Sequence, residues 1–226
     1  MRKVSGLQVV VFLFLLSCAA VVGVTAGVRL GSLLPAPGYR PIVTVLLAAA
    51  SSYLALMVIF RLFCRLFPLP EGEIPKESAA EFRYHVYLLF FLIAFYPVMF
   101  SMILPVPLMR LFYQALGARL GDNTYPGGIL MDPPFQHLGS NTIVGQGALI
   151  VPHVIEGERL AHYPVRIGNN VTIGARSVIL AGCVIEDGAT VAIGAVLPKG
   201  SHVRAGEVWG GVPARCLRSA GAAASA

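Results

Sequence analysis

A six-residue period in the second half of the chain constrains its fold more than any other feature. The same spacing of six residues separates three apolar residues nearer the middle of the chain, Leu138, Val144 and Ile150. A period of six fits neither an α-helix nor an open antiparallel sheet, and it predicts short strands stacked as the rungs of a parallel β-helix, a β-solenoid. Eight apolar residues keep the period without a miss: Ile167, Ile173, Ile179, Ile185, Val191, Leu197, Val203 and Trp209.

Composition predicts that another part of the chain lies in a membrane. Hydrophobic residues make up 56% of the chain and charged residues only 12%, whereas about a quarter of the residues of a soluble domain are charged. The excess of Lys and Arg over acidic residues is five in residues 1–116 and one in residues 117–226. The basic charge therefore accompanies the apolar segments, which argues against a nucleic-acid partner and for a membrane anchor.

Two uncharged stretches, 7–28 and 42–60, are long enough to cross a bilayer as transmembrane helices, which takes about 20 residues. The first could also be a cleaved signal peptide, but its apolar core is too long for one. A third stretch, 86–104, contains Pro97, and proline kinks a helix. It is expected either to span the membrane or to enter and return on the same side.

These features predict two domains and a tail. Residues 1–116 form an α-helical membrane anchor, 117–218 form the β-helix, and 219–226 form a disordered tail. Residues 71–83 are expected to form a charged interfacial linker and the start of a helix. Residues 107–120 are expected to form either a short amphipathic helix at the membrane surface or a plain connector.

The repeat is interrupted once. Ile150 and Ile167 are 17 residues apart where one rung would take six, so 11 residues are extra. Solenoids extrude insertions as loops, often on the functional face. The predicted loop, 151–166, holds His153, Glu156 and His162, and Asp132 lies about one coil upstream.

From Gly147 to Arg218 the sequence resembles the left-handed β-helix acyltransferases of the hexapeptide-repeat superfamily. The resemblance rests on "PVRIGNNVTIGARSVILAGCVIEDGATVAIGAVLPKG" after a His-bearing loop, and on the closing "VWGGVPARCLR". The apolar segments before "LGARLG" are similar to the membrane-embedded branch of that family. The chain departs from the serine acetyltransferases at Pro133 in "GILMDPP", where they have a histidine, which disfavours a serine acceptor.

The resemblance implies an acetyl-CoA-dependent O- or N-acyltransferase with a loop histidine as general base. His153 is the first candidate and His162 the second, with Glu156 or Asp132 orienting the imidazole. No resident metal is expected. The implied coenzyme A contacts lie in the last rungs and the closing motif: Lys199, Arg204, Trp209, Arg215, Arg218 and Gly194.

The anchor favours an acceptor held at the membrane, such as a lipid-linked sugar or surface-glycan precursor. The resemblance also implies a homotrimer, and a cytosolic supply of acetyl-CoA puts the β-helix on the inner face of the cytoplasmic membrane. Two alternatives remain open. One is a zinc hydratase of the γ-carbonic-anhydrase type, with His137, His153 and His162 as ligands. The other is a membrane-tethered β-helix that acts as a scaffold without catalysis.

Overall fold

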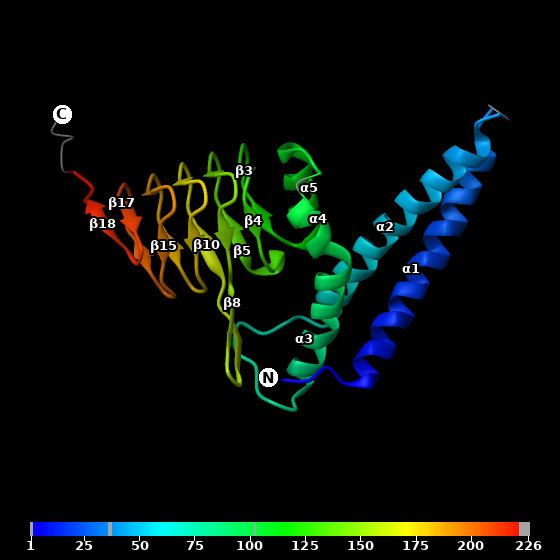
Figure 1. Ribbon diagram of the computed structural model, residues 1–226, viewed down its shortest axis with the longest axis horizontal. Helices are drawn as coiled ribbons and strands as arrows, with labels where there is room; N and C mark the ends of the chain where they lie inside the picture. The colour runs from blue at the N-terminus through cyan, green and yellow to red at the C-terminus, as the bar shows by residue number, and fades with distance from the viewer. Residues whose placement is uncertain (1, 36–37, 102, 222–226) are drawn as a thin grey trace. The chain divides into compact units, whose positions relative to one another are not determined.

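The computed structural model describes residues 2–35, 38–101 and 103–221. Of the predicted tail 219–226, residues 222–226 lie outside the described residues. The chain divides into two compact units (Figure 1). A helical unit contains residues 2–69 and 77–94, and a β-helix unit contains residues 70–76 and those from 95 onward.

The helical unit is built on a helical hairpin of α1 (Gly6–Ser32) and α2 (Arg40–Leu66). Three glycines of α1, at positions 23, 27 and 31, face α2 so closely that no side chain fits there. A Cβ on Gly23 would lie 2.1 Å from the Cα of Ser52, and a Cβ on Gly27 would lie 2.3 Å from the Cα of Ala48. Small residues at this spacing let two helix backbones pack directly, as in membrane helix pairs.

Within the part of the chain that the structure describes, three helical segments are long and apolar enough to cross a membrane: Gly6–Ser32, Arg40–Leu66 and Ala79–Ser101. The third consists of α3 (Ala79–Phe90), the π-helical turn η1 (Phe91–Phe95) and α4 (Tyr96–Ser101). It stays helical through Pro97 and so does not reverse there.

Helix α5 (Val106–Leu116) covers the first coil of the β-helix. Four of its side chains are buried: Met109, Phe112, Tyr113 and Leu116. The buried Tyr113 hydroxyl donates to the carbonyl oxygen of Gly128 and accepts from the amide of Leu130, both at 3.2 Å. Burial raises the pKa of this phenol to about 12, so it stays protonated and serves both bonds.

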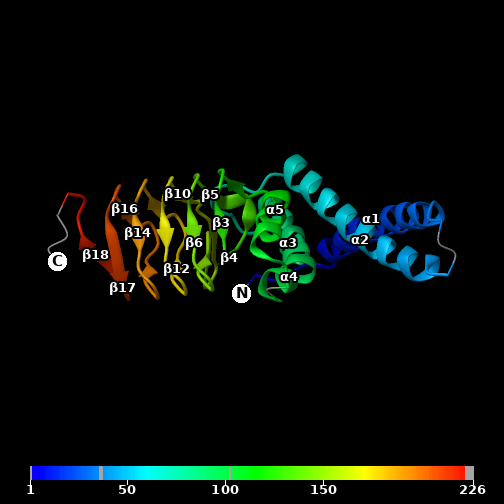
Figure 2. The same ribbon diagram turned by 90° about the horizontal axis from the view of Figure 1, so that it is seen from above.

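The β-helix itself has three parallel sheets, whose neighbouring strands come from successive coils (Figure 2). Ile167 pairs with Ile185 and Ile173 with Val191, so one coil takes 18 residues, or three rungs. Seven of the eight sixfold anchors are buried, and Trp209 is half-buried. The first sheet contains, in order, β16 (His202–Val203), β13 (Val184–Ile185), β10 (Val165–Ile167), β5 (Gln136–Leu138) and β2 (Arg119–Leu120). The second contains β17 (Val208–Gly211), β14 (Thr190–Val191), β11 (Thr172–Ile173), β6 (Ile143–Val144) and β3 (Tyr125–Pro126). The third contains β15 (Val196–Leu197), β12 (Val178–Ile179), β7 (Leu149–Ile150) and β4 (Ile129–Leu130).

Two antiparallel hairpins depart from this pattern. The C-terminal strand β18 (Ala214–Arg218) folds back on β17 and closes the last coil. The insertion forms β8 (His153–Glu156) and β9 (Arg159–His162), which turn at Gly157 with a φ of +60°. A third strand, β1 (Gly72–Glu73), pairs with β9. The sequence predicted only a linker there, because a two-residue strand has no period that could mark it.

Candidate functional site

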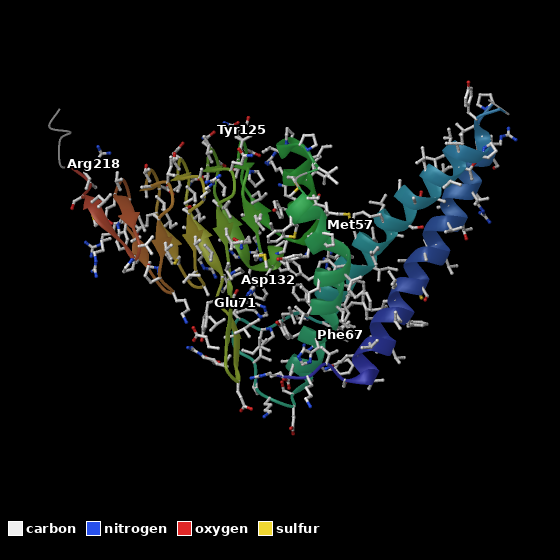
Figure 3. All side chains as sticks on the ribbon, in the orientation of Figure 1. Met57, Phe67, Glu71, Tyr125, Asp132 and Arg218 are labelled. Atoms are coloured by element: carbon white, nitrogen blue, oxygen red, sulfur yellow. The ribbon has the colours of Figure 1, made fainter. Side chains whose placement is uncertain are left out.

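The insertion places His153 beside Asp132. Strands β4 and β7 lie on neighbouring coils, with Leu130 opposite Ile150. Asp132 follows shortly after β4, and His153 follows shortly after β7. The Nδ1 atom of His153 lies 2.5 Å from Oδ2 of Asp132, a residue labelled in Figure 3. Asp132 has a φ of +44° and begins the 3₁₀ turn η2 (Pro133–Phe135). Left-handed backbone is uncommon outside glycine, and such strain is concentrated at functional sites.

The surroundings of His153 favour its protonated form. Burial alone lowers the pKa of this imidazole, but the hydrogen bond to Asp132 and the charge of that carboxylate raise it, with a net pKa above the usual 6.5. The Asp132 side chain is 5% exposed and that of His153 is 24% exposed. In the neutral imidazole the carboxylate accepts from Nδ1–H, so the Nε2 of His153 has the lone pair that can take a proton from outside.

His162 lies opposite His153 across the hairpin but is fully buried. Its ring stacks on Phe135, with ring centroids 4.3 Å apart and an interplanar angle of 3°. Burial lowers the pKa of His162 to about 4, with a smaller contribution from the neighbouring His153 and an opposing one from Asp132. At neutral pH this imidazole is therefore an uncharged ring in the core of the hairpin.

Glu156, the other predicted orienting carboxylate, is not beside His153. It lies at the exposed end of β8, where it pairs with Lys199 and lies 3.9 Å from Arg159. The hydrogen bond and charge of Lys199 lower the pKa of the Glu156 carboxyl. Glu156 and Lys199 thus tie the hairpin tip to the coils, and the structure brings only Asp132 to the imidazole.

Residues 71–76 hold the hairpin from its other edge. The buried Ile74 donates its amide to the carbonyl oxygen of Leu160 at 2.8 Å, next to the β1–β9 pairing. Glu73 accepts from Arg159 at 2.7 Å and from the hydroxyl of Tyr163 at 3.1 Å. Exposed ion pairs contribute little because solvent screens them, so the backbone pairing and the buried Ile74 do most to fix this edge.

The predicted coenzyme A residues lie in the last coils, but not all in one environment. Lys199 is engaged by Glu156. Arg215 and Arg218 are exposed on β18 (Arg218 is labelled in Figure 3), and Arg204 is exposed after β16. Trp209 donates its indole N–H to Glu207 at 2.8 Å. Gly194 sits at a corner with a φ of +67° and no atom within 4 Å of where a Cβ would be.

A separate hollow of about 660 Å³ lies along β2, β5, β10 and β13. Arg119, His137 and Arg166 line it from three successive coils. The Nδ1 of His137 accepts a hydrogen bond from Arg166 at 2.9 Å. Burial is the largest cause that lowers the pKa of His137, and the positive charges of Arg119 and Arg166 lower it further. Neither Asp132 nor His153 lines this hollow, so the hollow does not coincide with the histidine–carboxylate pair.

His137 lines this hollow, whereas the two hairpin histidines that the zinc alternative combines with it do not. Within residues 2–35, 38–101 and 103–221, no three His, Cys, Asp or Glu side chains form a group that could hold a metal ion.

Comparison with known proteins identifies the repeat. Residues 164–199 match the family model described as bacterial transferase hexapeptide (six repeats). This match confirms the predicted hexapeptide repeat over residues 164–199, and the three parallel sheets confirm the predicted parallel β-helix.

Two curated relatives have different activities. Gamma carbonic anhydrase 1, mitochondrial, of Arabidopsis thaliana is 38% identical over 100 residues, covering 36% of this chain and 35% of that protein. The 2,3,4,5-tetrahydropyridine-2,6-dicarboxylate N-acetyltransferase of Staphylococcus aureus (strain JH9) is 42% identical over 82 residues, covering 36% of this chain and 32% of that protein. The chain spans about a third of the length of these relatives.

Among solved structures, a hexapeptide-repeat acetyltransferase of Vibrio cholerae O1 biovar eltor complexed with acetyl-coenzyme A is 25% identical, with a TM-score of 0.40. The aligned region covers 46% of this chain and 60% of the Vibrio chain. Galactoside acetyltransferase in complex with coenzyme A is 22% identical, with a TM-score of 0.38, covering 55% of this chain and 76% of that chain.

Proposed function

We propose that this chain is a membrane-anchored acyltransferase of the hexapeptide-repeat transferase family. It moves an acetyl group from acetyl-CoA to a hydroxyl or amine of a membrane-associated acceptor, such as a lipid-linked sugar. One observation carries the proposal: the only insertion in the predicted repeat holds an imidazole whose Nδ1 is fixed by a buried carboxylate, with Nε2 left for an incoming proton.

The chemistry needs little more than a base, because a thioester is already an activated acyl donor. The Nε2 of His153 takes the proton of the acceptor O–H or N–H as that atom attacks the thioester carbonyl carbon. The C–S bond then breaks, and the departing thiolate receives the proton from the imidazolium to leave as the thiol of coenzyme A. Asp132 holds the tautomer and stabilises the transient imidazolium, which is why its charge matters.

The phosphates of coenzyme A need fixed cations, and the exposed arginines of the last coil and of β18 supply them. Arg204, Arg215 and Arg218 have this role in the proposal, with Arg ideal for phosphate because of its planar fork of donors. The open corner at Gly194 leaves room for a close approach of the pantetheine arm. Lys199 has an indirect role in the proposal: its side chain already pairs with Glu156 and so helps to hold the hairpin in place.

The acetyl transfer itself is the first test. Detergent-solubilised full-length protein is incubated with radiolabelled acetyl-CoA and extracted membrane lipids, and lipid-borne label and free thiol are measured together. We expect both from the natural chain and about 10²–10⁴-fold less of each from His153→Ala. His202→Ala is the matched control, because His202 is an exposed histidine of the same β-helix that pairs with Glu186. Equal label transfer by His153→Ala and the natural chain would refute the assignment.

The β-helix lies on the cytosolic face in this proposal, since acetyl-CoA is made there. The chain contains its own reporter, because Cys216 is exposed on β18 while Cys183 is buried. A membrane-impermeant maleimide should label Cys216 only after the cells are broken, with Cys216→Ser as control. Labelling in intact cells would put the β-helix outside. The proposed homotrimer is checked by the mass of the solubilised protein.

A zinc hydratase is the second candidate, favoured by the identity to the Arabidopsis γ-carbonic anhydrase. Zinc analysis of the purified protein separates the two. One zinc per chain, lost on replacing His153 or His162, would favour the hydratase, whereas acetyl transfer by zinc-free protein would favour the acyltransferase. A non-catalytic scaffold predicts that the cellular role survives His153→Ala.

A further inference from the structure

An apolar cavity of about 350 Å³ lies where α4 and α5 meet the first coil of the β-helix. Met99, Phe100, Val106 and Met109 form its helical wall, and residues 126–129 and 146–147 form the wall on the coils. Gln146 has the only polar side chain among these described lining residues. All of the lining belongs to the β-helix unit.

The helical wall continues from a segment apolar enough to cross a membrane. Met99 and Phe100 are among the last three residues of the span Ala79–Ser101. The chain that follows exposes further large apolar side chains, with Ile103 79%, Leu108 49% and Leu111 60% exposed. An amphipathic helix with such a face lies at the boundary between headgroups and acyl chains, so this cavity belongs at that depth.

The opposite wall leads directly to the dyad. Ile129 lines the cavity from β4, and Asp132 follows three residues later on the same stretch of chain. Three residues of extended chain span at most about 11 Å. The backbone of Ile129 in the cavity wall is therefore no more than about 11 Å from that of Asp132, a span that the part of a lipid outside the cavity can cover.

We infer that this cavity takes part of the hydrocarbon chain of a lipid-linked acceptor and so selects a lipid over a soluble sugar. The inference rests on the proposed acetyl transfer and names its substrate class. Ligand sites usually measure about 300–1,000 Å³, so the volume admits a stretch of one chain. An apolar wall suits methylene groups, whereas a sugar or phosphate there would lose its hydration without replacement hydrogen bonds.

The test compares two matched positions. Ile129 and Leu149 are partners in the register of β4 and β7, both half-buried and outward, but only Ile129 lines the cavity. Full-length protein in phosphatidylcholine nanodiscs is exposed to a hexadecyl glucoside with a diazirine in its chain, and the crosslinked peptides are mapped. We expect crosslinks at residues 99–109 and 126–129, reduced at least tenfold by Ile129→Glu and less than twofold by Leu149→Glu.

The pair Ile129→Trp and Leu149→Trp repeats the comparison by filling volume without adding charge, in case the charged variant fails to fold. Crosslinks confined to α1 and α2, or reduced equally at both positions, would overturn the inference.

Crosslinking by His153→Ala should match the natural chain, since the cavity does not need the base. Loss of acetyl transfer in the natural chain with cavity crosslinks intact would remove the proposed activity and leave lipid binding. Acetyl transfer without cavity crosslinks would remove the cavity alone.

Discussion

The two strands of the β8–β9 hairpin place a histidine opposite a histidine, in contrasting surroundings. His153 on β8 is partly exposed and bonded to Asp132, and its pKa is raised. His162 on β9 is fully buried against Phe135, and its pKa is lowered to about 4. The comparison teaches that the charge partner and the water around an imidazole, not its place in an insertion, decide whether it can exchange protons near neutral pH.

The largest expected effect is on His153. His153→Ala should reduce the rate of acetyl transfer by about 10²–10⁴-fold, the usual contribution of a general base. Urea unfolding of the same variant, followed through the single tryptophan, Trp209, should remain close to that of the natural chain, because His153 is partly exposed. A rate within threefold of the natural chain would mean that the two histidines do not differ as proposed.

Removing the charge of Asp132 should make the surroundings of His153 more like those of His162. Asp132→Asn keeps a residue type that tolerates left-handed backbone, and it should lower the transfer rate by about 10²-fold. The base form of His153 is active, so activity rises with pH through the pKa of its imidazole. Without the carboxylate only burial remains, and the acidic limb of the pH–rate profile should move to lower pH. An unmoved limb would show that another group titrates.

His162 should govern acid stability where His153 governs rate. In the unfolded chain His162 takes up a proton near pH 6.5, but in the folded chain only near pH 4. The folded state is therefore destabilised as pH falls from 6.5 towards 4, by roughly 3 kcal/mol at about 1.4 kcal/mol per pKa unit.

His162→Leu should lose this part of the pH dependence, measured as the difference between urea midpoints at pH 7 and pH 4.5. Equal pH dependence in the two proteins would contradict the buried neutral imidazole.

The smallest effect should come from Glu156, the carboxylate that lies on β8 but away from the imidazole. Glu156→Gln breaks an exposed pair with Lys199, and exposed pairs are screened by solvent, so the urea midpoint should stay close to that of the natural chain and the acidic limb should stay in place. A limb that moved as far as in Asp132→Asn would make Glu156 the orienting group.

Much of the fold could be predicted because the repeat is local. Anchors six residues apart need only the pattern itself to place Ile167 over Ile185, and the interruption had to leave the coils near Ile150. Asp132 and Glu156 could not be separated in this way. Which of the two carboxylates meets His153 depends on the strand register, in which Leu130 lies opposite Ile150. The turn at residues 133–135 shifts this pairing away from the regular 18-residue spacing.

By itself, the sequence determined the β-helix, the apolar helices and the position of the loop, because hydrophobic period and segment length express burial directly. Only the tertiary structure decided which histidine meets a carboxylate and which is enclosed, and that residues 72–73 brace the hairpin. Those outcomes depend on strands brought together from distant positions, and a single polar residue or a two-residue strand has no period of its own from which they could be predicted.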